Sequence, residues 1–254
     1  MWYSHPLTNA VLLKRYKRFL VDVLLPSGET LTVHCPNSGS MAGLLEEGNP
    51  VRISGPHGAH RKLRFTLEQI RIRRPDGRRV WVGVNTSIPN VLAEEAARLK
   101  RLPGLHFYTE PRREVKLGER SRIDMLLSAP ELPPCWVEVK NVTLVQEDTT
   151  LKLPVNTGTI AAFPDAVTAR GRKHLLELAD RVHAGERAVM LYVVQRGDAE
   201  SFAPAVGFDP EYSRTLQEVV KRGVEVIAMR ARVSARGVFL RRVLPTVFDG
   251  LAGN

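Results

Sequence analysis

Cysteine, aromatic side chains and long apolar runs are all scarce in this chain of 254 residues. Its two cysteines, Cys35 and Cys135, imply no disulfide framework, which fits reduced thiols and a cytoplasmic location. The longest apolar stretches, such as residues 188–194, fall far short of the roughly 20 residues that cross a bilayer. The first residues also lack the apolar core of a signal peptide. These absences predict a cytoplasmic protein without a membrane partner.

Acidic residues are also few, relative to the basic ones. The chain has 37 Lys and Arg against 27 Asp and Glu, a formal net charge of +10. Residues 1–85 hold 13 basic and 6 acidic side chains, whereas the remaining 169 residues hold 24 and 21. Basic side chains that face phosphates release counterions, so a basic module suits nucleic acid. A solubility surface has the same charge, so charge alone favours a nucleic-acid partner only modestly.

The first third of the chain has the pattern of a small β-barrel. Short apolar or alternating runs, separated by turn residues, predict strands at residues 19–25, 30–34, 51–53, 63–72 and 80–84. About five short strands in so few residues favour a closed barrel of the OB type. An SH3-like barrel would have the same pattern.

The spacing of apolar residues changes after Asn85, where we place the boundary between a first domain (1–85) and a second (86–254). Helices are predicted at residues 90–99, 169–183 and 210–222. Strands are predicted at residues 107–109, 123–127, 136–139, 188–194, 224–229 and 237–243, the last at a sheet edge. This order predicts an α/β domain with a mixed sheet.

Charged residues interrupt two apolar strands of the second domain. Asp124 lies within 123–127, and Glu138 and Lys140 share one strand face because they are two residues apart. Adjacent carboxylates repel each other, and a divalent cation such as Mg²⁺ or Mn²⁺ is a natural reason to hold them together. Lys140 would position the attacking water or stabilise the transition state. The arrangement resembles the PD-(D/E)xK nuclease motif, although a surface salt bridge between Glu138 and Lys140 gives the same local pattern.

Longer matches are more specific than this motif. They comprise residues 15–19, 34–41, 80–86, 89–90, 121–124, 137–144 and 163–175. Through them the chain resembles the sugar fermentation stimulation protein A family. The resemblance implies an N-terminal OB-like domain, a C-terminal PD-(D/E)xK nuclease-like domain and DNA binding. It also implies a link to the regulation of sugar metabolism genes. The segment 145–162 looks longer than the family's usual link, and we interpret it as a flap beside the site.

Further side chains are candidates for the site. Glu95 matches the family's helical Glu and would complete the metal site, although a solvated helix face is as good an interpretation. One helix face contains Arg170, Lys173 and His174 and would bind a phosphate. An ordinary amphipathic helix has the same pattern.

The barrel offers a second set of candidates for nucleic-acid binding. Arg15, Lys17 and Arg18 lie beside aromatic residues, and Ser38 and Ser40 lie in a polar loop that is equally interpreted as a turn. Gln195 and Arg196 end a buried strand on the side where such sites open, a weaker indication.

Two functions remain open at this point. The first is a metal-dependent nuclease with Asp124, Glu138 and Lys140 at its centre. The presence of all three residues favours this function. The second is a non-catalytic DNA-binding regulator on a nuclease scaffold.

Overall fold

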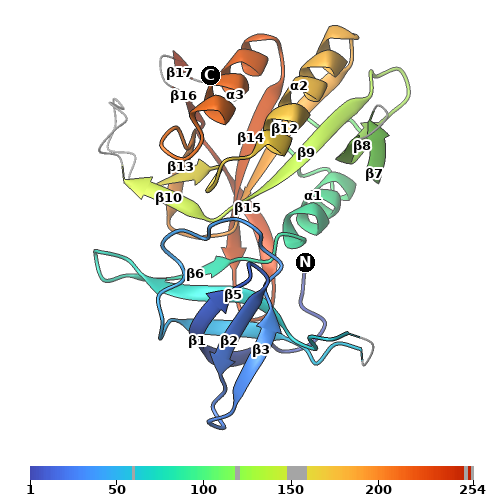
Figure 1. Ribbon diagram of the computed structural model, residues 1–254. Coiled ribbons are helices and arrows are strands. Elements are labelled where there is room, and N and C mark those ends of the chain that lie inside the picture. Colours follow the sequence, from blue (N-terminus) through green and yellow to red (C-terminus); the bar gives the residue numbers. More distant parts are fainter. Residues whose placement is uncertain (59–60, 118–120, 148–158, 249–250, 253–254) are drawn as a thin grey trace.

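The first domain in the computed structural model is a six-stranded barrel (Figure 1); the structure describes residues 1–58, 61–117, 121–147, 159–248 and 251–252. The strands are ordered β3-β2-β1-β4-β5-β6, and a bridge between His34 and Thr66 brings β3 beside β5 to close the barrel. Their bounds are β1 (Thr8–Tyr16), β2 (Leu20–Leu24), β3 (Thr30–His34), β4 (Pro50–Ser54), β5 (Thr66–Arg73) and β6 (Arg79–Gly83). The OB-type prediction is confirmed.

Strand β1 was not predicted. Its Ala10 and Leu12 are buried in the barrel core, but Val11 between them is exposed and Leu13 is half-buried. Because the outward positions are also apolar, the sequence shows a continuous run instead of the alternation that marks a half-buried strand.

The second domain is built on a mixed sheet ordered β15-β14-β12-β9-β8-β7. Its strands are β7 (Glu110–Leu117), β8 (Ser121–Ser128), β9 (Cys135–Val142), β12 (Arg187–Val194), β14 (Glu225–Val233) and β15 (Val238–Leu244). The central strands β9, β12 and β14 are parallel, and the outer strands pair antiparallel. The predicted mixed-sheet domain is therefore confirmed.

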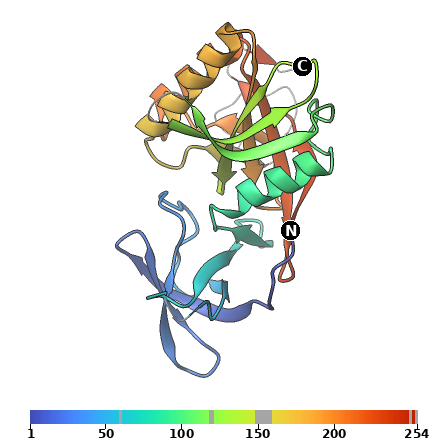
Figure 2. The same cartoon turned by 90° about the vertical axis from the view of Figure 1, so that its right-hand side faces the viewer.

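Helices cover both faces of this sheet (Figure 2). Val189, Leu191 and Val193 of β12 pack in one core with α1 (Ile88–Arg98). Met190 and Tyr192 pack in the other core with α2 (Ala169–His183) and α3 (Pro210–Lys221). Because both faces are buried, β12 is apolar at every position from 188 to 194.

A smaller sheet lies beside the main one. It contains β10 (Leu144–Glu147), β11 (Thr159–Phe163) and β13 (Ala199–Pro204), and the short strands β16 (Val247–Phe248) and β17 (Leu251–Ala252) pair with each other. The ends of the segment interpreted as a flap are thus the antiparallel strands β10 and β11. Residues 148–158, the rest of that segment, lie outside the described residues. The strand predicted at 107–109 is wrong; the edge strand is the charged β7, which begins at Glu110.

Backbone contacts fix the two domains against each other. The Gly83 amide donates to the Gln195 carbonyl (2.8 Å), and the Gln195 side chain donates to Asn85 O (3.1 Å) and Asn141 Oδ1 (2.8 Å). A Cβ atom on residue 83 would lie 2.5 Å from Gln195 Oε1, so only glycine fits there. Arg196 is buried in a bidentate pair with Asp198. Gln195 and Arg196 therefore support the domain junction.

The first residues of the chain also join the domains. Tyr3 donates its amide to Arg236 O (3.0 Å), and Trp2 forms a bridge with Gly237. Residues 1–3 thus pair with the second domain, although they precede the barrel. No helix in the described part of the chain is long and apolar enough to cross a membrane.

Candidate active site

Asp124 and Glu138 lie on neighbouring strands at the point where their pairing ends. The register of β8 and β9 pairs Met125 with Val137, and extending it by one position sets Asp124 opposite Glu138. The ladder stops there, and Asp124 Oδ2 accepts the Val139 amide instead (2.8 Å). The end of the β8–β9 ladder therefore places the two carboxylates next to each other.

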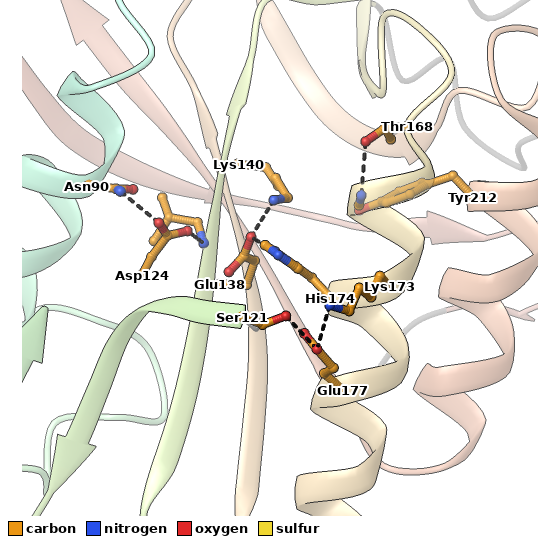
Figure 3. Close-up of polar contacts among 12 residues, drawn as sticks. Asn90, Ser121, Asp124, Glu138, Lys140, Thr168, Lys173, His174, Glu177 and Tyr212 are labelled. Carbon is orange, nitrogen blue, oxygen red and sulfur yellow. Dashed lines mark hydrogen bonds and ion pairs between the residues drawn. The ribbon is translucent and has the colours of Figure 1, made fainter. Parts of the chain in front are cut away.

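Two hydrogen-bond donors contact one carboxylate oxygen of Glu138, and neither of them contacts the other oxygen. Lys140 and His174 both donate to Glu138 Oε1, and Figure 3 shows Glu138 between them. Burial alone would raise the pKa of Glu138, but these hydrogen bonds and positive charges hold it below its usual value. Because an ionised carboxylate can only accept, the His174 proton is on Nδ1. Oε2 is buried, and no donor among the described residues reaches it.

Asp124 has the opposite electrostatic environment. Burial, and then the nearby charge of Glu138, raise its pKa to about 6. The Val139 amide and the Asn90 side chain, whose Nδ2 donates to Oδ1 (2.8 Å), oppose this shift without cancelling it. A partly buried carboxylate beside a second carboxylate is stabilised by a cation.

The residues present fit a small divalent cation. No donor among the described residues reaches Glu138 Oε2, and the neighbouring Asp124 supplies a second carboxylate, whose pKa is raised first by burial and then by the charge of Glu138. No group of three or more His, Cys, Asp or Glu side chains is placed to hold a metal within the described ranges. Two carboxylates would suffice for Mg²⁺, which keeps several waters and also binds substrate phosphate. Asp124 and Glu138 would hold the ion.

Glu95 does not join this site. Its carboxylate, 44% exposed, accepts from the Met1 amino group at 2.6 Å and lines a separate cavity. Asn90 of the same helix contacts Asp124 instead. Five residues separate the two, which turns Glu95 about 140° around the helix from Asn90. The expectation that Glu95 completes the metal site is therefore wrong.

The predicted basic face of α2 divides into two parts. His174 is buried against Glu138, so it supports the site and does not offer a surface for phosphate. Arg170 is exposed and lines the cleft beside the site. Lys173 is exposed and pairs with Glu177 at 3.5 Å. The Thr168 side chain begins this helix by accepting the Gly171 amide, which orients His174 toward β9.

A cleft of about 1260 Å³ runs between the barrel and the second domain. Its lining includes cations from both domains, serine hydroxyls from the barrel and carboxylates from the second domain: Lys17, Arg18, Ser38, Ser40, Arg122, Asp124, Glu138, Lys140 and Arg170. Lys17 and Arg18 are exposed at the turn between β1 and β2, and both have positive φ values, 48° and 63°. The turn thus presents two adjacent cations to the same space as the carboxylates.

Arg15 also lines the cleft, but its guanidinium is committed to the barrel itself. It donates to four carbonyls: Arg18 O, Asn37 O, Gly39 O and Ser40 O. Arg15 therefore holds the polar loop against the β1–β2 turn, and little of its hydrogen-bonding capacity is left for a phosphate.

The polar loop of the barrel contacts the second domain. Ser40 Oγ donates to Asp165 O (2.6 Å), and the Met41 amide donates to Asp165 Oδ2 (2.9 Å). A Cβ atom on residue 39 would lie 2.5 Å from Asp165 Oδ1. Ser40 is therefore a bridge between domains, whereas Ser38 is exposed in the cleft.

Both domains match known family models. The second matches the sugar fermentation stimulation protein RE domain over residues 87–237, and the first matches the SfsA N-terminal OB domain over residues 13–84. The chain belongs to the sugar fermentation stimulation protein family. A sugar fermentation stimulation protein homologue from Rhodospirillum rubrum is 45% identical to this chain, and the match covers 97% of this chain and 99% of the homologue. One from Geotalea uraniireducens is 47% identical, with 92% and 94% covered. The resemblance seen in the sequence is confirmed.

A solved structure in this family has the same fold. It is the structure of Pyrococcus furiosus SfsA in complex with Ca²⁺, with a TM-score of 0.82 and 22% identity. The match covers 98% of each chain, so the barrel and the mixed-sheet domain are both shared.

In this family member, replacing His174 with leucine should weaken Mn²⁺ binding by about 10- to 100-fold. Glu138 would lose a donor that fixes its orientation, and outer partners of metal ligands typically contribute this much to affinity. Asparagine at position 174 should retain most of the affinity, because its amide can donate from near the position of Nδ1. Calorimetric titration with Mn²⁺ would measure both.

His183→Leu, at an exposed position on the same helix, is the matched control and should bind Mn²⁺ normally. Wild-type Mn²⁺ affinity in the leucine variant would show that the contact with Glu138 does not orient this carboxylate.

Proposed function

We propose that this protein is a metal-dependent nuclease that acts on nucleic acid, DNA in the first place, in the cleft between its domains. One observation carries the proposal: Glu138 presents a buried oxygen that no donor of the described residues reaches, opposite Asp124 and next to Lys140, inside a cleft with exposed cations. A module that only binds DNA gains nothing from carboxylates that face phosphates, because they repel the ligand.

Each residue has a separate role in this proposal. Asp124 and Glu138 hold Mg²⁺ or Mn²⁺, and His174 orients Glu138. When bound, the cation supplies Lewis-acid stabilisation of the phosphoryl oxygens and lowers the pKa of water. Lys140 donates to the developing negative charge or orients the water. Lys17, Arg18 and Arg170 bind the flanking phosphates and align the strand.

The solved relative supports the choice of a divalent cation. The P. furiosus protein was obtained in complex with Ca²⁺. Ca²⁺ and Mg²⁺ are both hard ions that prefer oxygen ligands, which is the donor type that Asp124 and Glu138 supply.

A cleavage assay tests the proposal. Purified protein is incubated with single- and double-stranded DNA and with RNA, in Mg²⁺, in Mn²⁺ and in EDTA. We expect cleavage in either metal and none in EDTA, and Glu138→Gln should abolish it. Binding without cleavage on every substrate would overturn the nuclease and favour the second candidate.

That second candidate is a non-catalytic DNA-binding protein. The charge of the barrel region favours it, since residues 1–85 contain 13 basic and 6 acidic side chains. This function requires that DNA binding be independent of metal. It does not explain why the carboxylates of Asp124 and Glu138 lie next to each other.

A further inference from the structure

The outer face of β4, β5 and β6 carries a second group of basic residues. Arg71 pairs with Trp81 across the strands, and Arg73 pairs with Arg79. Arg52 of β4 lies beside them, opposite Gln69. Side chains of paired residues in an antiparallel sheet, and of residues two apart on one strand, project from the same face. We call these four arginines and Trp81 the arginine face.

The charges of this face are not paired with carboxylates of the described residues. In the described part of the chain, no carboxylate lies within 4.0 Å of the nitrogens of any of the four arginines. Arg74 and Arg78 on the same hairpin are different, since they pair with Asp198 and Asp76. Arg73 and Arg79 stand directly opposite each other, where like charges destabilise a sheet. A surface that keeps such a pair suits an anionic partner.

Trp81 contacts two of these arginines, Arg52 and Arg71. The guanidinium of Arg52 lies 3.7 Å from the centre of the indole ring, and that of Arg71 lies 5.4 Å away. Arg52 also donates to Gln69 Oε1 (3.0 Å), while its buried Nε has no hydrogen-bond partner among the described residues. Because Arg52 lies over one face of the indole, that face is not open for a base to stack on. The groups offered to a ligand are therefore guanidinium N–H donors.

The arginine face is separate from the cleft. None of its five residues lines the cleft, whose barrel side comes from the β1–β2 turn and the loop after β3. A ligand at this face would thus be held by different residues from those that surround Glu138.

We propose that the arginine face binds the phosphodiester backbone of a nucleic acid. It would be a second contact site for a strand that also occupies the cleft. Guanidinium groups match phosphate oxygens with paired hydrogen bonds. Contacts to phosphate carry no base readout, so the binding is independent of sequence. The inference rests on the proposed function in that the ligand is nucleic acid, but it requires no cleavage.

The test compares two triple variants of the full chain. Arg71→Gln/Arg73→Gln/Arg79→Gln removes three charges from the face. Arg101→Gln/Arg112→Gln/Arg222→Gln removes three from exposed positions of the second domain and is the matched control. Fluorescence anisotropy in EDTA measures the affinity for DNA of about 30 nucleotides, single- and double-stranded, over a range of salt concentrations.

We expect the face variant to bind at least about tenfold more weakly at low salt, with a slope of log K against log salt flatter by about two to three units for the duplex. The control should resemble the wild type. A variant with lysine at the three positions should keep most of the slope, because the charge is retained, and it guards against a folding defect.

Two further arms separate the possible outcomes. An oligonucleotide of about six nucleotides, within the site size of one OB fold, is too short to occupy the cleft and the face together, so the face variant should lose less affinity for it than for long DNA. Long DNA that binds the face variant and the control alike would overturn the inference while the proposed function stands. Vesicles rich in phosphatidylglycerol test an anionic lipid surface. Loss of vesicle binding, with DNA binding unchanged, would also overturn it. A wild type that binds neither oligonucleotide would instead refute the proposed function.

Discussion

Replacing Lys140 with alanine should slow metal-dependent cleavage by about 100- to 1000-fold and change DNA affinity by less than about twofold. The ammonium group lies beside Glu138, and its side chain is 18% exposed at the edge of the cleft. Negative charge builds up on the phosphoryl oxygens only as the reaction proceeds. One preorganised donor to such a charge typically contributes two to three orders of magnitude in rate. Ground-state binding comes from the other cations and should persist.

Single-turnover rates and anisotropy on the same substrate would measure the two effects separately. Lys221→Ala, at the exposed end of α3, is the matched control and should leave both unchanged. If Lys140→Ala cleaves at the wild-type rate, the lysine has no part in the chemical step. If it loses DNA binding in proportion to its rate, Lys140 is a binding residue only.

Replacing Asp124 with asparagine should abolish cleavage and, without metal, stabilise the protein at neutral pH. The pKa of Asp124 is raised from 3.8 to about 6 in the fold. A carboxyl group with a raised pKa favours folding fully below its unfolded pKa, and this contribution is lost as the pH rises through about 6. Above that pH, the charged form costs up to about 3 kcal/mol, at 1.36 kcal/mol per pKa unit. Asparagine is neutral throughout and avoids this cost.

Urea unfolding in EDTA between about pH 4 and pH 8 would test this result. The gain in the free energy of unfolding should grow from near zero at pH 4 to its full value above pH 7. Asp180→Asn, on the exposed side of α2, should show no such trend. A variant less stable than the wild type at pH 8 would contradict the raised pKa. Saturating Mn²⁺ should reverse the order, because only the wild type gains binding energy from the ion.

Periodicity predicted the elements that are half-buried or buried on both sides. The helix over 169–183 and the strand over 30–34 have the predicted bounds. The charged edge strand β7 was missed because solvent faces most of its side chains, so its sequence carries no apolar signal.

Within the candidate site, the sequence placed Asp124 and Glu138 on adjacent strands, but it could not show what surrounds them. Asn90 contacts Asp124 while Glu95 does not, a difference set by helical phase that only the packing of α1 reveals. The commitment of Arg15 to backbone carbonyls depends on how a distant loop folds back. Pattern alone shows which side chains are basic, not which are already occupied.

The contacts of Gln195 and Asp165 bear on where a strand in the cleft would be cut. Both join the barrel to the second domain, one at the end of β12 and the other at the polar loop. These contacts set the spacing between the cations of the β1–β2 turn and the carboxylates of β8 and β9. Under the proposed function, the enzyme would measure a fixed distance along the strand. It would cut each strand a set number of nucleotides from the point where the barrel holds it, whatever the sequence between.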